Sequence, residues 1–276
     1  MKSEIAFAFE VDDEQTKLLV PRRSPGIWTG FGVVLLYFAM QLVAGLVLGI
    51  AAGFWYGATH AHATHTANAG SIGKLTGNSE FTMAATVAGL IFATAVTLWV
   101  VRRRWPDLWA TREPPGFGMI KPQSMLYFAY AVLAGLILAV LSGPLTNLIA
   151  HGREWHQDVA QMALAGSWFL RIPLILSVVC VAPAIEELVF RGVLLSGLMH
   201  RLRTGWAVIL SALLFGCVHV PDFKSVWYAV PAIVLMGLVL AWLRLKSRSL
   251  WPAITAHATN NLVVIVGLVL ASHLHG

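Results

Sequence analysis

The sequence predicts an all-α fold, a polytopic transmembrane helical bundle of seven to eight helices. Composition is the first observation: 58% of the 276 residues are hydrophobic and only 12% are charged, about half the charged fraction of an average soluble domain. The second is that long apolar runs alternate with short basic loops, the pattern of helices that cross a bilayer. In such a chain the net charge of +6 reports which loops face the cytoplasm, so we expect no nucleic-acid partner.

The elements follow in chain order. Segment 1–26 is expected to be a cytosolic tail, because it is acidic where a signal peptide is basic and has no continuous apolar core. Seven apolar runs come after it. The fifth of them is shorter than the roughly 20 residues needed to cross, so it must tilt, sit deep in the bundle or belong to a broken element. Segment 153–171, polar at both edges, could add an interfacial or re-entrant helix. The seven apolar runs are 27–56, 81–101, 124–149, 169–199, 205–220, 225–243 and 250–272.

Basic residues gather in the loops between these runs. With seven crossings, all four basic clusters fall on one side of the membrane, which the positive-inside rule assigns to the cytoplasm. The N-terminus is then cytoplasmic and the C-terminus lies outside. The clusters are Arg22 and Arg23; Arg102, Arg103 and Arg104 with Arg112 and Lys121; Arg201 and Arg203; and Arg244, Lys246 and Arg248.

The loop 57–80 is rich in glycine, alanine and threonine and carries His60, His62 and His65. We expect it to be flexible and extracytoplasmic. Its imidazoles could bind a metal loosely, but no cysteine or carboxylate sits beside them, so a solvated loop is the favoured interpretation. Cys180 and Cys217 both lie in apolar sequence and are expected to be small buried hydrophobic residues.

Ionisable residues inside the apolar runs are few. Of 13 Asp and Glu residues, only Glu186 and Glu187 lie in the middle of a span, and of ten histidines only His219 and His257 are embedded in span sequence. Such residues face a bundle interior and mark functional sites. At about 1.5 Å of rise per residue from the basic flanks, Glu186, His219 and Asn261 reach similar depths of roughly 20–24 Å, and His257 about 14 Å.

Spacing within the fourth run indicates how its charges are arranged. Glu187 and Arg191 are i and i+4, so an ion pair can neutralise one of the two carboxylates. Glu186 points about 100° away and can face a neighbouring helix. Pro183, three residues earlier, is expected to free a backbone carbonyl and to leave room for water.

Together these groups suit hydrolysis of an amide by an activated water. Glu186 is a candidate general base, and a histidine within reach could share the water. His257 and Asn261 are i and i+4 on one helix face and could donate hydrogen bonds to a developing oxyanion. No Gly-x-Ser-x-Gly string surrounds a serine, and the absence of His-Glu-x-x-His excludes a zincin.

Three short motifs on separate spans resemble the signature of a known family. They are Glu186-Glu187-x-x-x-Arg191, Phe215-x-x-x-His219 and His257-x-x-x-Asn261. In this order they look like the motifs of the CPBP family, the CAAX proteases and bacteriocin-processing enzymes also called Abi proteins. The resemblance covers roughly residues 126–271. It implies a glutamate-dependent intramembrane protease, once labelled a metalloendopeptidase, in a helical bundle around a water-filled cavity open to cytosol and lipid.

The resemblance also implies roles for individual residues. Glu186 and His219 would activate the water, and His257 and Asn261 would stabilise the oxyanion. Asn260 beside Asn261 is disfavoured by spacing alone.

The other motif positions would support this chemistry. Glu187 and Arg191 would orient Glu186 and tune it electrostatically, or form only a structural ion pair. Phe215 is expected to be a packing residue. The implied organisation is a tail (1–26), two helices with a flexible loop (27–123) and the catalytic bundle (124–276).

Alternatives remain for the cofactor and for the function. No cofactor is expected, and a zinc ion held by Glu186, His219 and His257 is the minor alternative. A proton-coupled transporter and a non-catalytic bacteriocin-immunity factor are the other function classes. The expected partners are membrane lipid and a peptide or C-terminal segment of a membrane-associated protein, in a prokaryotic plasma membrane.

Overall fold

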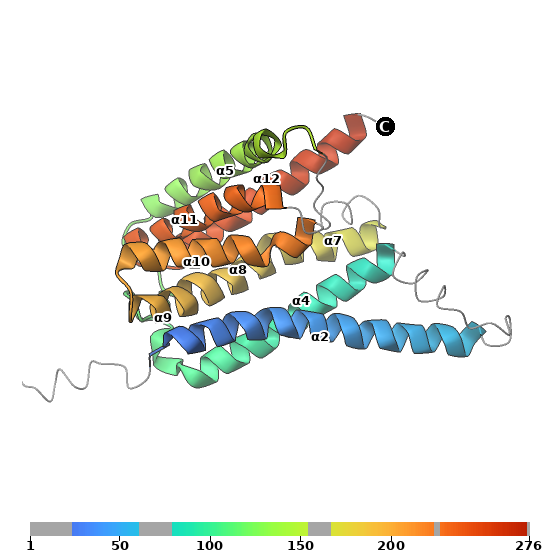
Figure 1. Cartoon of the computed structure of the whole chain (residues 1–276), viewed down its shortest axis with the longest axis horizontal. Coiled ribbons are helices and arrows are strands. Elements are labelled where there is room, and N and C mark those ends of the chain that lie inside the picture. The colour runs from blue at the N-terminus through green and yellow to red at the C-terminus, as the bar shows by residue number, and fades with distance from the viewer. Residues whose placement is uncertain (1–23, 61–78, 154–166, 224–226, 275–276) are drawn as a thin grey trace, which may run out of the picture.

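A computed structural model describes residues 24–60, 79–153, 167–223 and 227–274. In these ranges the chain is all-helical and makes seven passes through one bundle (Figure 1), which confirms the predicted fold class. Six passes are long and apolar enough to cross a membrane, and the fifth, with 15 residues, is shorter, as expected. The passes are α2 (Ile27–His60), α4 (Ser79–Arg104), α5 (Leu126–Ala150), the run α7 to α9 (Trp168–Met199), α10 (Thr204–Val218), α11 (Val230–Ser247) and α12 (Trp251–Leu274).

The basic ends of these passes lie together. Figure 1 shows the start of α2, the end of α4, the turn from α9 to α10 and the turn from α11 to α12 at the same end of the bundle, with the C-terminal end of α12 at the other. This arrangement is the one the charge pattern predicts for seven crossings. Which end faces the cytoplasm stays a prediction.

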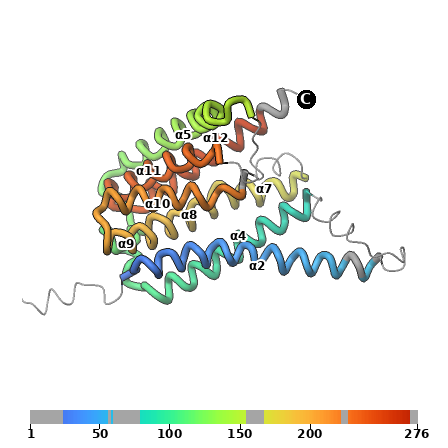
Figure 2. Tube along the Cα trace, in the orientation of Figure 1, coloured from blue at the N-terminus to red at the C-terminus, as the bar shows by residue number. Residues whose placement is uncertain are grey.

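The passes fall into two groups with the α7–α9 run between them (Figure 2). On one side α2 packs against α4 and against the end of the α7–α9 run; on the other, α5 packs against α12, and α11 contacts α5, α10 and α12. The α5–α12 contact is close because residue 135 is glycine. A Cβ on Gly135 would lie 2.5 Å from the carbonyl oxygen of Ala256. The backbones of α5 and α12 are therefore in direct contact at Ala256, the residue before His257.

The fourth pass changes its helical winding twice. It comprises α7 (Trp168–Leu176), a π-helical turn η3 (Ser177–Val181), α8 (Ala182–Glu187), a second π-helical turn η4 (Leu188–Leu194) and α9 (Leu195–Met199). Single π turns inside α-helices are rare and concentrate at functional sites. Here they flank the short α8 that ends in the two adjacent glutamates.

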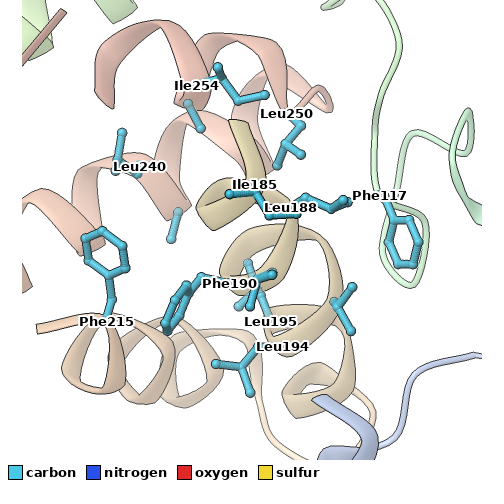
Figure 3. Close-up of a cluster of buried hydrophobic side chains, with 14 of the residues drawn as sticks. Phe117, Ile185, Leu188, Phe190, Leu194, Leu195, Phe215, Leu240, Leu250 and Ile254 are labelled. Carbon is cyan, nitrogen blue, oxygen red and sulfur yellow. The ribbon is translucent and has the colours of Figure 1, made fainter. Parts of the chain in front are cut away.

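A buried hydrophobic core fixes this irregular segment in place. Every residue of η4 is buried. Figure 3 shows its side chains packed with those of neighbouring helices, so the glutamates stand on a rigid backbone. The residues labelled there are Phe117, Ile185, Leu188, Phe190, Leu194, Leu195, Phe215, Leu240, Leu250 and Ile254.

Arg244 differs from its expected role as a loop charge. Its side chain is fully buried at the end of α11. It donates hydrogen bonds to the carbonyl oxygens of Arg112 (3.0 Å) and Gly116 (2.7 Å), because a buried guanidinium requires acceptors. Arg244 thus anchors the connection between α4 and α5 onto α11.

Two further expectations were wrong. Both cysteines, Cys180 and Cys217, are exposed rather than buried, because the outer surface of a membrane bundle is itself apolar and hydropathy does not separate it from the core. The predicted loop starts later than expected, since α2 continues to His60. Residues 154–166 of the segment 153–171, which could add an eighth helix, lie outside the described residues, as do His62 and His65.

Candidate active site

The predicted site residues come from three passes and converge. Glu186 and Glu187 are the last residues of α8, and Arg191 follows in η4. His219 lies directly after α10, and His257 with Asn261 lies on α12. Sequence reasoning therefore identified groups that the fold brings to one place.

Four of the six predicted site residues border a cavity of about 1410 Å³. Glu186, His219 and His257 line it, together with Asn260 and Asn261 on α12. Most of the remaining wall is apolar.

The same cavity reaches the outer face of the bundle along α2. Trp28, Leu35 and Leu42 line it, and their side chains are 70–85% exposed. Because these residues belong to an apolar membrane-length helix, the cavity opens where lipid would contact the bundle.

Glu187 lies behind the cavity wall in a fully buried cluster. One of its carboxylate oxygens, Oε1, accepts hydrogen bonds from Arg191 Nη1 at 2.8 Å and from His257 Nδ1 at 3.0 Å. Arg191 also donates to the carbonyl oxygen of Gly237 at 3.1 Å. The i, i+4 ion pair is therefore present, with a third member, His257, that spacing alone did not indicate.

Phe215 connects this cluster to the cavity. Its ring lies 4.2 Å from the Arg191 guanidinium carbon, 4.7 Å from the His219 ring and 5.7 Å from the His257 ring, measured to the ring centre. A cation over a ring face is favourable when both are desolvated. Phe215 is a packing residue, as predicted, and it packs against both imidazoles.

Glu186 faces both histidines across the cavity. Its Oε2 lies 3.8 Å from His219 Nε2 and 3.9 Å from His257 Nε2. These separations are too long for direct hydrogen bonds and suit a bridging water.

The second nitrogen of each ring fixes its orientation. His219 Nδ1 donates to the carbonyl oxygen of Phe215 at 2.7 Å, because a carbonyl can only accept. Neutral His219 therefore presents an unprotonated Nε2 to Glu186. His257 Nδ1 likewise donates to the Glu187 carboxylate.

Asn261 is held by two bonds. Its Nδ2 donates to the carbonyl oxygen of Val178 at 3.0 Å, and its Oδ1 accepts from Asn260 at 3.1 Å. The Ala182 amide bonds to the Ser177 carbonyl, five residues back. The next bond of that π pattern would run from Pro183 to Val178, and proline has no N–H. Pro183 thus leaves the Val178 carbonyl without a backbone donor, and the Asn261 amide donates to that carbonyl instead.

A zinc ion does not fit the three expected ligands as they stand. Two ligands each about 2.0 Å from a tetrahedral zinc lie about 3.3 Å apart, whereas Glu186 is 3.8 Å and 3.9 Å from the two histidines. Within the described ranges, no three His, Cys, Asp or Glu side chains are grouped so that they could hold a metal ion.

Sequence reasoning missed Tyr37. Tyr37 lies on α2, 149 residues before Glu186 in the chain, and its hydroxyl donates a hydrogen bond of 3.5 Å to Glu186 Oε1. In the sequence Tyr37 is one more aromatic residue in an apolar run, so no local pattern distinguished it.

Comparison with known proteins agrees with this geometry. Residues 167–263 match the family described as type II CAAX prenyl endopeptidase Rce1-like. This part of the chain is similar to the Rce1-like family. It contains all six predicted site residues, whereas α2, α4 and α5 precede it.

A search of curated proteins adds a distant relative. The Bacillus subtilis (strain 168) protein named "Putative membrane peptidase YdiL" is 26% identical over 140 residues, which make up 49% of this chain and 54% of that protein. The match thus spans about half the length of the curated relative. No solved structure matches the chain.

Proposed function

We propose that the protein is an intramembrane endopeptidase that cleaves a peptide bond with a water molecule activated by Glu186 and His219. The observation that carries the proposal is the position of Glu186 Oε2, within 4 Å of two imidazole nitrogens at the wall of one cavity. The match of residues 167–263 to the Rce1-like family supports the same reaction class.

Glu186 and His219 bind and activate the attacking water. Both present acceptor atoms, a carboxylate oxygen and an unprotonated nitrogen, so a water between them donates to each and turns a lone pair toward the substrate. The water oxygen bonds to the carbonyl carbon while one of its protons passes to Glu186. Glu186 then returns that proton to the departing amine nitrogen as the C–N bond breaks.

His257 and Asn261 donate hydrogen bonds that stabilise the oxyanion. In this role His257 carries protons on both ring nitrogens, one donated to Glu187 and one to the oxyanion. Glu186, Glu187, Arg191 and His257 then sum to zero charge, which limits the cost of burying them. Asn261 has a second amide proton besides the one bonded to Val178, and this proton is available to the substrate.

The cavity suggests the class of substrate. Its wall is mainly apolar, and it opens on the lipid-facing side of α2 through Leu35 and Leu42. A peptide segment of a membrane-associated protein fits such an entrance, since it can approach within the bilayer without crossing water.

The mechanism uses no metal, and chelation tests that. Cleavage by the purified protein should be unchanged by 1,10-phenanthroline, and elemental analysis should find far less than one zinc per chain. Loss of cleavage in the chelator, restored by added zinc, would instead establish the zinc alternative.

The proposal is tested by comparing peptides released from membranes that contain the wild-type chain or Glu186→Gln. Peptides absent from the variant identify substrates, whose cleavage is then repeated with purified protein in liposomes. The control is Glu113→Gln, which removes a carboxylate paired with Arg248 at the surface. Equal cleavage by wild type and Glu186→Gln, or none by either, would overturn the proposal and favour the immunity-factor or transporter alternatives.

A further inference from the structure

Tyr37 lies at the site, although it belongs to a helix outside the segment that matches the family. Its side chain is fully buried and forms part of the cavity wall. Its hydroxyl donates to Glu186 Oε1 at 3.5 Å. The N-terminal helix α2 therefore supplies a polar group to the candidate general base.

The two oxygens of Glu186 face different partners. Oε1 faces the Tyr37 hydroxyl, and Oε2 faces the two imidazoles. A carboxylate turns about its last side-chain bond with a broad preference, so a donor on one oxygen helps to define the direction of the other. At 3.5 Å the bond is longer than the roughly 2.5–3.0 Å usual for O–H···O bonds, and catalytic hydrogen bonds often tighten only when substrate is bound.

Close backbone packing brings Tyr37 to this position. A Cβ on Gly30 would lie 3.2 Å from the Leu194 Cα, and one on Gly197 would lie 2.6 Å from the Gly26 carbonyl oxygen. These glycines let α2 approach η4 and α9 directly. Tyr37 is seven residues, about two turns, beyond Gly30 and therefore on the same helix face.

Aromatic packing limits how the Tyr37 ring can move. Its centre lies 5.0 Å from the Phe38 ring in an edge contact, and Phe38 in turn lies 6.5 Å from Phe190 in η4. The ring that carries the hydroxyl therefore packs on Phe38, and Phe38 contacts the turn η4 that follows the two glutamates.

We propose that Tyr37 is a positioning residue: its hydroxyl orients the Glu186 carboxylate so that Oε2 points at the water shared with His219. This proposal rests on the proposed peptidase function for its kinetic consequence, but the bond itself is independent of that function. It makes α2 part of the catalytic unit rather than a separate N-terminal anchor.

The kinetic test is Tyr37→Phe, which removes one oxygen and keeps the ring. Loss of a hydrogen bond to a charged group should lower kcat roughly ten- to 150-fold. KM should change less than about twofold, because Tyr37 acts on the water step rather than on substrate binding. The control is Tyr130→Phe, on α5 and half exposed away from the cavity, which should leave both constants unchanged.

The activity-independent test is infrared spectroscopy of the full chain in micelles. The difference between wild type and Glu186→Gln identifies the Glu186 carboxyl band, and Tyr37→Phe should shift that band whereas Tyr130→Phe should not. The reciprocal measurement needs no Tyr37 variant: Glu186→Gln should shift one tyrosine C–O band, seen with ring-labelled tyrosine.

The outcomes separate the two proposals. Unshifted bands in both measurements overturn the role of Tyr37, whatever the protein cleaves. A shifted band with a kcat equal to wild type also overturns it, because the bond then does not serve the reaction. Shifted bands in a chain that cleaves nothing support the Tyr37–Glu186 bond and overturn the peptidase function.

Discussion

Arg191 neutralises a carboxylate that has no access to water. Glu187 and Arg191 are both fully buried and bonded at 2.8 Å, so without Arg191 the Glu187 carboxylate keeps only its bond to His257. Two glutamates that are adjacent in sequence thus have different roles: Glu186 faces the cavity and Glu187 faces the protein.

The first residue-scale prediction concerns stability. Arg191→Ala strands the Glu187 charge and should lower the free energy of unfolding by about 3–5 kcal/mol, with a large drop in melting temperature. The control Arg248→Ala breaks an exposed pair with Glu113 and should cost about 1 kcal/mol or less. Equal melting temperatures for Arg191→Ala and wild type would show that the pair does not stabilise the fold.

The second residue-scale prediction concerns the imidazole that shares the water. His219→Ala should reduce kcat at least about a hundredfold, because general-base assistance contributes about 10²–10⁴. Its melting temperature should stay near wild type, since His219 is only partly buried. Retained cleavage in a folded His219→Ala protein would remove His219 from the mechanism.

At the scale of the element, Pro183 links the winding of the fourth pass to the site. The proline removes the donor that the π pattern would direct at the Val178 carbonyl, and Asn261 bonds there instead. One residue on the fourth pass therefore sets the position of a side chain on the seventh.

The prediction at this scale is that Pro183→Ala separates activity from stability. The alanine would supply an N–H that competes with Asn261 for the Val178 carbonyl, so kcat should fall at least about tenfold as the oxyanion donor loses its position. The melting temperature should not fall, because a helical hydrogen bond is regained.

Pro173→Ala is the matched control. Pro173 also lies inside the fourth pass, in α7, and it does not line the cavity, so its replacement should leave kcat unchanged. Equal effects of the two replacements would mean that general loosening of the pass, rather than Asn261, explains the loss.

At the scale of the whole molecule, an odd number of passes places the start of α2 and the end of α12 on opposite sides of the membrane. The described basic clusters lie at the ends of α4 and α11 and in the turn from α9 to α10. Figure 1 shows these three places at the same end of the bundle, and the positive-inside rule assigns that end to the cytoplasm.

The prediction is that Arg103→Cys and Glu80→Cys, at opposite ends of α4, react with a membrane-impermeant maleimide from opposite sides. The background for both is a chain with Cys180 and Cys217 replaced by alanine. Arg103→Cys should react only after the cytoplasmic side is opened. Labelling of Arg103→Cys in intact cells would reverse the assigned orientation.

The depths predicted from the sequence differ from the distances within the site. The count from the basic flanks separated Glu186 and His257 by about 8 Å along the membrane normal, yet their side chains lie 3.9 Å apart. The stretch from Glu186 to Arg201 includes a π-helical turn, which rises less per residue than an α-helix, and the passes cross at angles. A count at uniform rise includes neither effect.

The sequence by itself determined the class of fold, the seven passes, the three motifs and the Glu187–Arg191 pair. Hydrophobicity and helical spacing are local properties, and burying charge in lipid is so unfavourable that the few charged residues had to converge. Only the tertiary structure decided that Tyr37 reaches Glu186, that Asn261 bonds to Val178, that Arg244 is buried and that both cysteines are exposed. Those outcomes depend on how closely particular helices approach, which glycine contacts and side-chain packing set across distances that no sequence period encodes.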